Sequence, residues 1–174
     1  MPVALLAGML VVVMGVSGSG KSSVGVGIAE RLGLPYIEGD DFHPPENVAK
    51  MASGKPLDDN DRWPWLESLH QKLLAAATSG SGCVMVCSAL KKSYRDLLRD
   101  GLPEPLHIVY LHGEPELLLE RLGDRDGHFF PPALLDSQFE ALEEPKSALR
   151  VSIEPSLEEV IENATNQLRT IPDL

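Results

Sequence analysis

The stretch GVSGSGKS, residues 15–22, limits what this chain can fold into more than any other part of the sequence. It matches the phosphate-binding loop pattern G-x-x-x-x-G-K-[ST] at every fixed position. An apolar run from Met9 to Met14 precedes it and predicts a buried parallel strand, and a helix is predicted to follow from Lys21 to about Leu32. Because strand, loop and helix signals occur in this order, we interpret the motif as a nucleotide site rather than a chance turn rich in glycine and serine.

Each residue type in the loop suits phosphate binding for a chemical reason. Its three glycines allow backbone conformations in which successive N–H groups point inward around phosphates, at the positive end of the next helix. Lys21 is expected to reach the β- and γ-phosphates, and the Ser22 hydroxyl is expected to bind magnesium. The residues expected to contact ATP are Gly15, Val16, Ser17, Gly18, Ser19, Gly20, Lys21 and Ser22.

Length and charge restrict the remaining possibilities. A chain of 174 residues with 43% apolar residues suits one domain, residues 1–174, that buries a full core. The net charge of -11 argues against nucleic acid or an anionic membrane as a partner, although basic groups in a cleft can still bind phosphates. The expected partner is therefore a small-molecule substrate.

Two further features suggest a cytoplasmic protein. Cys83 and Cys87 lie in one apolar run, too far apart along a strand to pair easily, and their spacing does not fit a metal site. They are expected to be free buried thiols. The run from Val3 to Met14 resembles part of a signal peptide, but no basic residue precedes it, and it is too short to cross a membrane.

The chain alternates apolar strands with helical stretches, which predicts an α/β fold: a parallel sheet with helices on both faces. Strands are expected at Tyr36–Glu38, Cys83–Cys87, Ile108–Leu111 and Leu149–Ile153, besides the first. Helices are expected from Pro44 to Ala52, from Asp58 or Asp59 to Thr78, from Ser88 onward, from Glu114 to Leu122, from Leu134 to Leu142 and after the capping box of Ser156 and Glu159.

The class of nucleotide enzyme can be narrowed. A GTPase needs a base-reading N-K-x-D element, which the sequence lacks, and the D-x-x-G match at 124–127 trails a helix, so we treat it as accidental. A motor-type ATPase needs a strand that ends in an acidic residue; only Tyr36–Glu38 does so, and Asp40 follows at once. Small-molecule kinases use this position for the acceptor, so these carboxylates favour phosphoryl transfer onto a bound hydroxyl.

Several blocks resemble the gluconokinases of the small phosphate-loop kinase type, which are related in fold to shikimate and adenylate kinases. The blocks span most of the chain from Met14 to Pro145, and they are MGVSGSGKS, GDDFHP, ENVAKMASGKPLDDNDRWPWL, CSALKKSYRDLLR, RDGHFF and SQFEALEEP. The resemblance implies a five-stranded parallel sheet, a small mobile lid, ATP with Mg2+, a homodimer and transfer of the γ-phosphoryl group to the 6-hydroxyl of D-gluconate. Kinases of shikimate type often end the second strand in D-x-D; Glu38 replaces the first Asp here, which gives more weight to Asp40.

The acceptor side can also be argued from chemistry. Asp40 could take the proton of the acceptor hydroxyl, although it could instead cap a helix. A sugar acid presents a carboxylate that suits an arginine fork. The resemblance makes Arg62 the first candidate, because its block matches the substrate helix of that family; a surface ion pair is the alternative. His43 and Lys91 are further substrate-binding candidates that could equally be structural or solvated. Trp65 is expected to pack rather than to contact substrate.

A lid is predicted at about residues 122–131, a polar stretch hinged by Gly123 and Gly127. Arg121 and Arg125 lie four residues apart and could close on the phosphates from one helix face, Arg121 as a nucleotide contact and Arg125 as a catalytic group. A solvated pair balanced by neighbouring aspartates is the alternative. Two other functions stay open: a kinase of another small hydroxy acid or polyol, shikimate-like, and a non-catalytic nucleotide-binding module.

Overall fold

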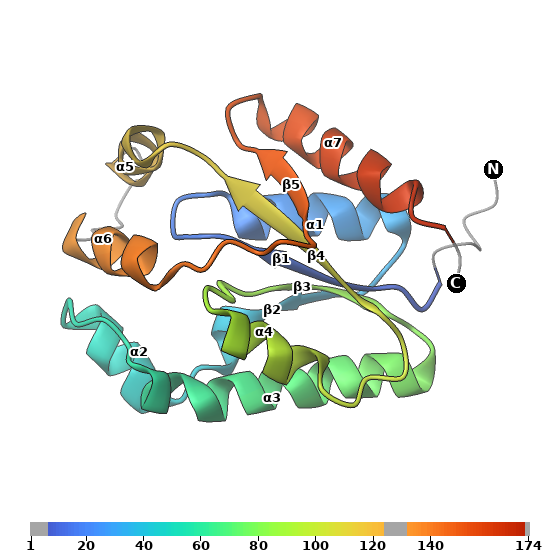
Figure 1. Cartoon of the computed structure of the whole chain (residues 1–174), viewed down its shortest axis with the longest axis horizontal. Helices are drawn as coiled ribbons and strands as arrows, with labels where there is room; N and C mark the ends of the chain where they lie inside the picture. The colour runs from blue at the N-terminus through green and yellow to red at the C-terminus, as the bar shows by residue number, and fades with distance from the viewer. Residues whose placement is uncertain (1–6, 124–131, 173–174) are drawn as a thin grey trace.

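The computed structural model describes residues 7–123 and 132–172. Within them five parallel strands form one sheet in the order β2-β3-β1-β4-β5 (Figure 1). The central strand β1 is fully buried, because a parallel strand covered on both faces has no side that faces water. The predicted five-stranded parallel sheet with helices on both faces is thus confirmed. The strands are β1 Leu10–Met14, β2 Tyr36–Glu38, β3 Cys83–Val86, β4 Leu106–His112 and β5 Leu149–Ser152.

Seven α-helices and a short 3₁₀ helix are described besides the sheet. The 3₁₀ helix, Gly39–Phe42, continues directly from β2. Helix ends agree with the sequence signals: Gly33 ends the first helix in the left-handed conformation, and the side chains of Asp58 and Ser156 cap two others. The α-helices are α1 Lys21–Leu32, α2 Pro45–Ala52, α3 Asp59–Ser79, α4 Lys92–Arg99, α5 Pro115–Gly123, α6 Pro132–Ala141 and α7 Leu157–Arg169.

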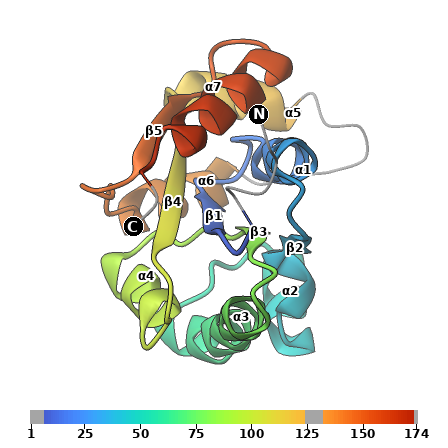
Figure 2. The same ribbon diagram turned by 90° about the vertical axis from the view of Figure 1, so that its right-hand side faces the viewer.

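The sheet separates two hydrophobic cores. Helices α1 and α7 pack on one face, and α3 and α4 pack on the other, as Figure 2 shows from the end of the molecule. Alternate β1 residues supply the two cores: Val11 and Val13 face α1, whereas Leu10 and Val12 face α3. Both cysteines are free and buried in the second core, as predicted.

One predicted boundary is wrong. A helix was expected to open at Ser88, but residues 88–91 form a loop and α4 begins at Lys92. Ala89 has φ 46°, in the left-handed region that an α-helix cannot contain. Arg95 donates to the carbonyls of Ala89 and Leu90 at 2.7 and 3.0 Å, which holds this loop in place.

Among the residues that the structure describes, no helix combines the length and the apolar character that crossing a bilayer requires.

Candidate active site

The phosphate-binding loop joins β1 to α1 as the motif predicts. Gly20 is the N-cap of α1 at φ 82°, a conformation that favours glycine. The Ser19 hydroxyl donates to the Val16 carbonyl at 2.7 Å, and Lys21 Nζ donates to the same carbonyl at 3.1 Å. These contacts close the loop upon itself at the N-terminus of the helix, where backbone N–H groups and the helix dipole favour an anion.

Glu38, whose role the sequence left open, lies against the start of α1. Its Oε2 accepts hydrogen bonds from the Ser22 hydroxyl and the Tyr36 hydroxyl, each at 2.6 Å. Burial and the contact with Glu38 raise the pKa of Tyr36, so this phenol stays a donor. A hydroxyl and a carboxylate are hard oxygen ligands of the kind that magnesium prefers. In the two described stretches, no three acidic, histidine or cysteine side chains form a metal-binding group by themselves.

Asp40 occupies the first turn beyond β2. Gly39 makes this position possible, because a Cβ there would overlap the Val86 carbonyl of the neighbouring strand. The Trp65 indole also donates to the Gly39 carbonyl at 2.8 Å and ties α3 to this turn. The Asp40 side chain is 74% exposed and faces the cavity described below. Pro44 is the N-cap of α2, and no described side chain caps that helix, so Asp40 does not have the capping role.

His43 contacts residues of both α2 and α3. Its ring stacks on Trp65 with centroids 4.0 Å apart, and Asn47 Nδ2 lies 3.3 Å from His43 Nδ1. Burial lowers the pKa of His43 despite Asp40, whose Oδ1 is 3.7 Å from Nε2. A neutral imidazole at pH 7 can donate or accept a single hydrogen bond at the cavity wall.

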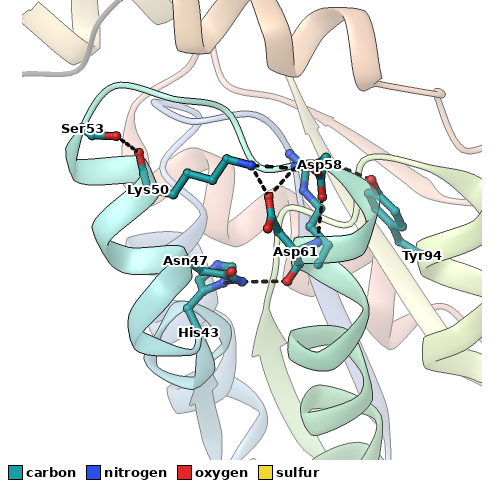
Figure 3. Close-up of polar contacts among 8 residues, drawn as sticks. His43, Asn47, Lys50, Ser53, Asp58, Asp61 and Tyr94 are labelled. Atoms are coloured by element: carbon teal, nitrogen blue, oxygen red, sulfur yellow. Dashed lines mark hydrogen bonds and ion pairs between the residues drawn. The ribbon is translucent and has the colours of Figure 1, made fainter.

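Polar contacts fix α2 against α3 (Figure 3). Lys50 Nζ contacts Asp61 Oδ2 at 2.6 Å and Asp58 Oδ2 at 3.8 Å, and Asn47 donates to the Asp61 carbonyl at 2.8 Å. The hydrogen bond with Asp61 raises the pKa of Lys50 and lowers that of Asp61, so both stay charged at neutral pH. The contacts place the start of α3, and with it Arg62, relative to the turn that carries Asp40.

Arg62 belongs to a polar network. Its Nη1 donates to the Tyr94 hydroxyl at 3.0 Å, Tyr94 in turn donates to Asp59, and Lys91 Nζ contacts Asp59 at 2.9 Å. The contacts with Tyr94 and Lys91 lower the pKa of Asp59, and burial together with Asp59 raises that of Tyr94. Lys91 therefore neutralises Asp59, and Tyr94 orients the guanidinium of Arg62.

A cavity of about 420 Å³ lies between the phosphate loop, Asp40, His43 and Arg62. The phosphate loop, the turn after β2 and residues from α2, α3 and α6 all contribute to its wall. Lys91 lies outside it, in an adjoining hollow of about 520 Å³ that shares Arg62. The polar residues lining the cavity are Ser17, Lys21, Ser22, Asp40, His43, Lys55, Arg62, Ser88, Ser137 and Gln138.

Lys55 and Gln138 are among the lining residues that were not predicted as contacts. Lys55 reaches the cavity from the turn after α2, and Gln138 binds the phosphate loop from α6: its Oε1 accepts the Ser17 N–H at 2.7 Å. Both lie in blocks that carry the family resemblance, which marked the regions but not the contacts. Nothing local in the sequence indicates that α6 packs against a loop near the N-terminus.

Arg121, one of the two arginines predicted to close on the phosphates, does not line the cavity. Arg121 Nη2 donates to the Ile153 carbonyl at 2.6 Å, beyond the end of β5. Arg125 and most of the predicted lid, 124–131, lie outside the described residues. The roles given to both arginines stay predictions.

The chain resembles known kinases, which agrees with a cavity built around a phosphate-binding loop. Residues 17–169 match the family model for shikimate kinase. The gluconokinase of Gluconobacter oxydans is 50% identical over 156 residues, covering 87% of this chain and 86% of that protein. The chain belongs to the gluconokinase family.

Other members of the gluconokinase family are also similar to this chain over most of its length. The thermosensitive gluconokinase of Escherichia coli is 44% identical over 164 residues, covering 94% of this chain and 87% of that protein. The crystal structure of a gluconokinase from Sinorhizobium meliloti superposes with a TM-score of 0.86 at 48% identity and covers 94% of this chain and 93% of that one. The phosphate loop, Asp40 and Arg62 thus belong to an ATP-dependent kinase.

Proposed function

We propose that this protein is a gluconokinase that transfers the γ-phosphoryl group of ATP to the 6-hydroxyl of D-gluconate, giving 6-phospho-D-gluconate and ADP. One observation carries the proposal: Lys21 of the phosphate loop, Asp40 and Arg62 line one cavity. Phosphoryl transfer needs neutralised charge around the moving group and an acceptor oxygen held in line, and this cavity offers both a cationic loop and an acceptor wall. The sequence identity with gluconokinases supports the choice of acceptor.

Each residue has a separate role in the proposal. The loop N–H groups and Lys21 hold the β- and γ-phosphates, which lowers the charge that builds up during transfer. Asp40 hydrogen-bonds the acceptor hydroxyl and takes its proton, and Arg62 binds the acceptor carboxylate. His43 and Lys55 are placed to contact acceptor hydroxyls or phosphate oxygens, whereas Lys91 acts through Asp59.

Ser22 and Glu38 fit a magnesium ion, because a hydroxyl and a carboxylate oxygen, both hard ligands, lie 2.6 Å apart at the start of α1. When bound with ATP, the ion would neutralise phosphate charge. Arg121 and Arg125 complete the proposal as groups that close on the phosphates from the lid. We also propose that the protein acts in the cytoplasm as a homodimer; its two free, buried thiols are consistent with a reducing compartment.

A coupled ADP-release assay tests the proposal with a panel of acceptors: gluconate, other sugar acids, polyols and shikimate. Turnover with ATP should need gluconate, and Lys21→Ala should lower it by about a hundredfold or more while the far-ultraviolet circular dichroism stays unchanged. A preference for shikimate or a polyol would show a different acceptor. ATP binding with no turnover on any acceptor would show a non-catalytic nucleotide-binding module.

A further inference from the structure

The side chain of Gln138 connects helix α6 to the phosphate loop. Gln138 makes two hydrogen bonds to the same loop residue: Oε1 accepts the Ser17 backbone N–H at 2.7 Å, and Nε2 donates to Ser17 Oγ at 2.9 Å. The helix that carries Gln138 is fixed in turn, because Leu134 and Leu135 on α6 are buried. The side chain of Gln138 is therefore presented to the loop by a packed helix.

The chemistry of the two partners determines the direction of both bonds. A backbone N–H can only donate, so the oxygen of the Gln138 amide must face it, and the amide nitrogen then faces the Ser17 hydroxyl. Because that nitrogen can only donate, Ser17 Oγ is the acceptor in the second bond. The hydroxyl proton of Ser17 must then point away from Gln138, and Ser17 lines the cavity of the phosphate loop.

Phosphate oxygens only accept hydrogen bonds, so a hydroxyl next to a nucleotide helps when it donates. We propose that Gln138 is a positioning residue that fixes the Ser17 peptide and turns the Ser17 hydroxyl into a donor toward the phosphates of the nucleotide. The inference rests on the proposed function only in that ATP occupies the phosphate loop. It assigns nucleotide-binding roles to a serine hydroxyl and to a glutamine distant in sequence.

The substitution Gln138→Glu isolates this effect, because it changes little in shape. A glutamate carboxylate accepts from the Ser17 N–H as the amide does, but its second oxygen also accepts, so the hydroxyl would turn to donate to Glu and present its lone pairs to the phosphates. The added negative charge repels the nucleotide as well. Ser17→Ala removes the hydroxyl and separates the two effects, because only the charge effect persists in the double variant.

The experiment is calorimetric binding of a non-hydrolysable ATP analogue with magnesium, without acceptor, to the wild-type protein and three variants: Gln138→Glu, Ser17→Ala and the double variant. We expect Gln138→Glu and Ser17→Ala each to weaken binding by about tenfold or more, as for reversed or lost hydrogen bonds to a charged group. In the Ser17→Ala background, Gln138→Glu should cost several-fold less than in the wild type. Asp136→Ala, on the exposed side of α6, serves as control and should bind normally.

The double-variant comparison decides the matter. Equal losses from Gln138→Glu in both backgrounds would mean that charge alone acts, and unchanged binding by Gln138→Glu would mean that the contact has no role; either result overturns the proposal. Thermal unfolding of each variant checks that the fold is intact. Since no acceptor is present, a failure of the gluconate assay in the wild-type protein would overturn the proposed function and leave this result unaffected.

Discussion

At the scale of single residues, Arg62 depends on neighbours that do not themselves line the main cavity. Tyr94 accepts a hydrogen bond from Arg62 and donates one to Asp59, which Lys91 neutralises. The flexible side chain of an arginine loses conformational freedom when it binds a carboxylate. The hydrogen bond with Tyr94 already restricts Arg62 before the acceptor binds, which lowers this entropic cost. Tyr94 should therefore affect binding of the acceptor more than binding of the nucleotide.

The first residue-scale prediction concerns Tyr94→Phe. Loss of the two hydrogen bonds that the hydroxyl makes with Arg62 and Asp59 should raise KM for gluconate by about tenfold or more and leave KM for ATP within about twofold. Tyr110→Phe is the matched control, because that hydroxyl bonds Glu144 on another part of the fold. Steady-state kinetics with each substrate varied in turn gives both constants. Equal increases for the two substrates would point to a general loss of structure instead.

At the scale of elements, the loop between β3 and α4 is shaped by a buried cation. Arg95 is 3% exposed, and its guanidinium donates to the carbonyls of Ala89, Leu90 and Glu143. Burial lowers the pKa of Arg95, but a guanidinium still stays charged at neutral pH. The three bonds join the loop that carries Ser88 to the segment after α6, so one side chain ties a wall of the cavity to a distant part of the chain.

We predict that Arg95→Met lowers the free energy of unfolding by about 3 kcal/mol, because it leaves buried carbonyls without a donor. The gluconate KM should rise too, since Ser88 and Leu90 line the cavity. Chemical denaturation followed by circular dichroism measures the first effect, and kinetics the second. Arg99→Met on the exposed side of the same helix is the control, expected to change stability by less than about 0.5 kcal/mol.

Elements were easier to predict from the sequence than contacts were. Buried parallel strands such as Leu10–Met14 are continuous apolar runs, and glycine or proline marks most helix ends, so the five-stranded sheet followed from local signals. The helix expected at Ser88 failed because Arg95 and Glu143, farther along the chain, set the conformation of Ala89 and Leu90. Gln138 was missed for the same reason: its partner Ser17 is a neighbour in space alone.

At the scale of the whole molecule, the two thiols report on opening of the core. Cys83 and Cys87 are each 1% exposed, between the sheet and helices α3 and α4. Burial raises the pKa of Cys83 to about 11 and that of Cys87 to about 12, above the ordinary value of about 8.5. The thiols of the unfolded chain therefore ionise at a lower pH than those of the folded protein. As a result, the free energy of unfolding falls as pH rises above about 9.

We predict that a thiol reagent such as Ellman's reagent labels the native protein at least about a hundredfold more slowly than the unfolded protein, because reaction requires the core to open. Two thiols per chain should react at once in guanidinium chloride. Saturating ATP with gluconate should slow native labelling further, since ligands that bind the folded state lower the population that opens. Labelling at the unfolded rate without denaturant would contradict the buried positions of both residues.

The strand order has a consequence for how the chain folds as it is made. β1, which ends at the phosphate loop, pairs with β3 and β4, so Val11 meets Val84 and His107. On a ribosome β1 therefore emerges long before either neighbour exists, as a strongly apolar segment with unsatisfied backbone groups. Strands that lie far apart in the sequence pair slowly, because a long stretch of chain must first be brought together. The residues that later hold the nucleotide thus directly follow the segment that depends longest on protection from aggregation. A chaperone that binds short apolar strands would find its first target in that segment.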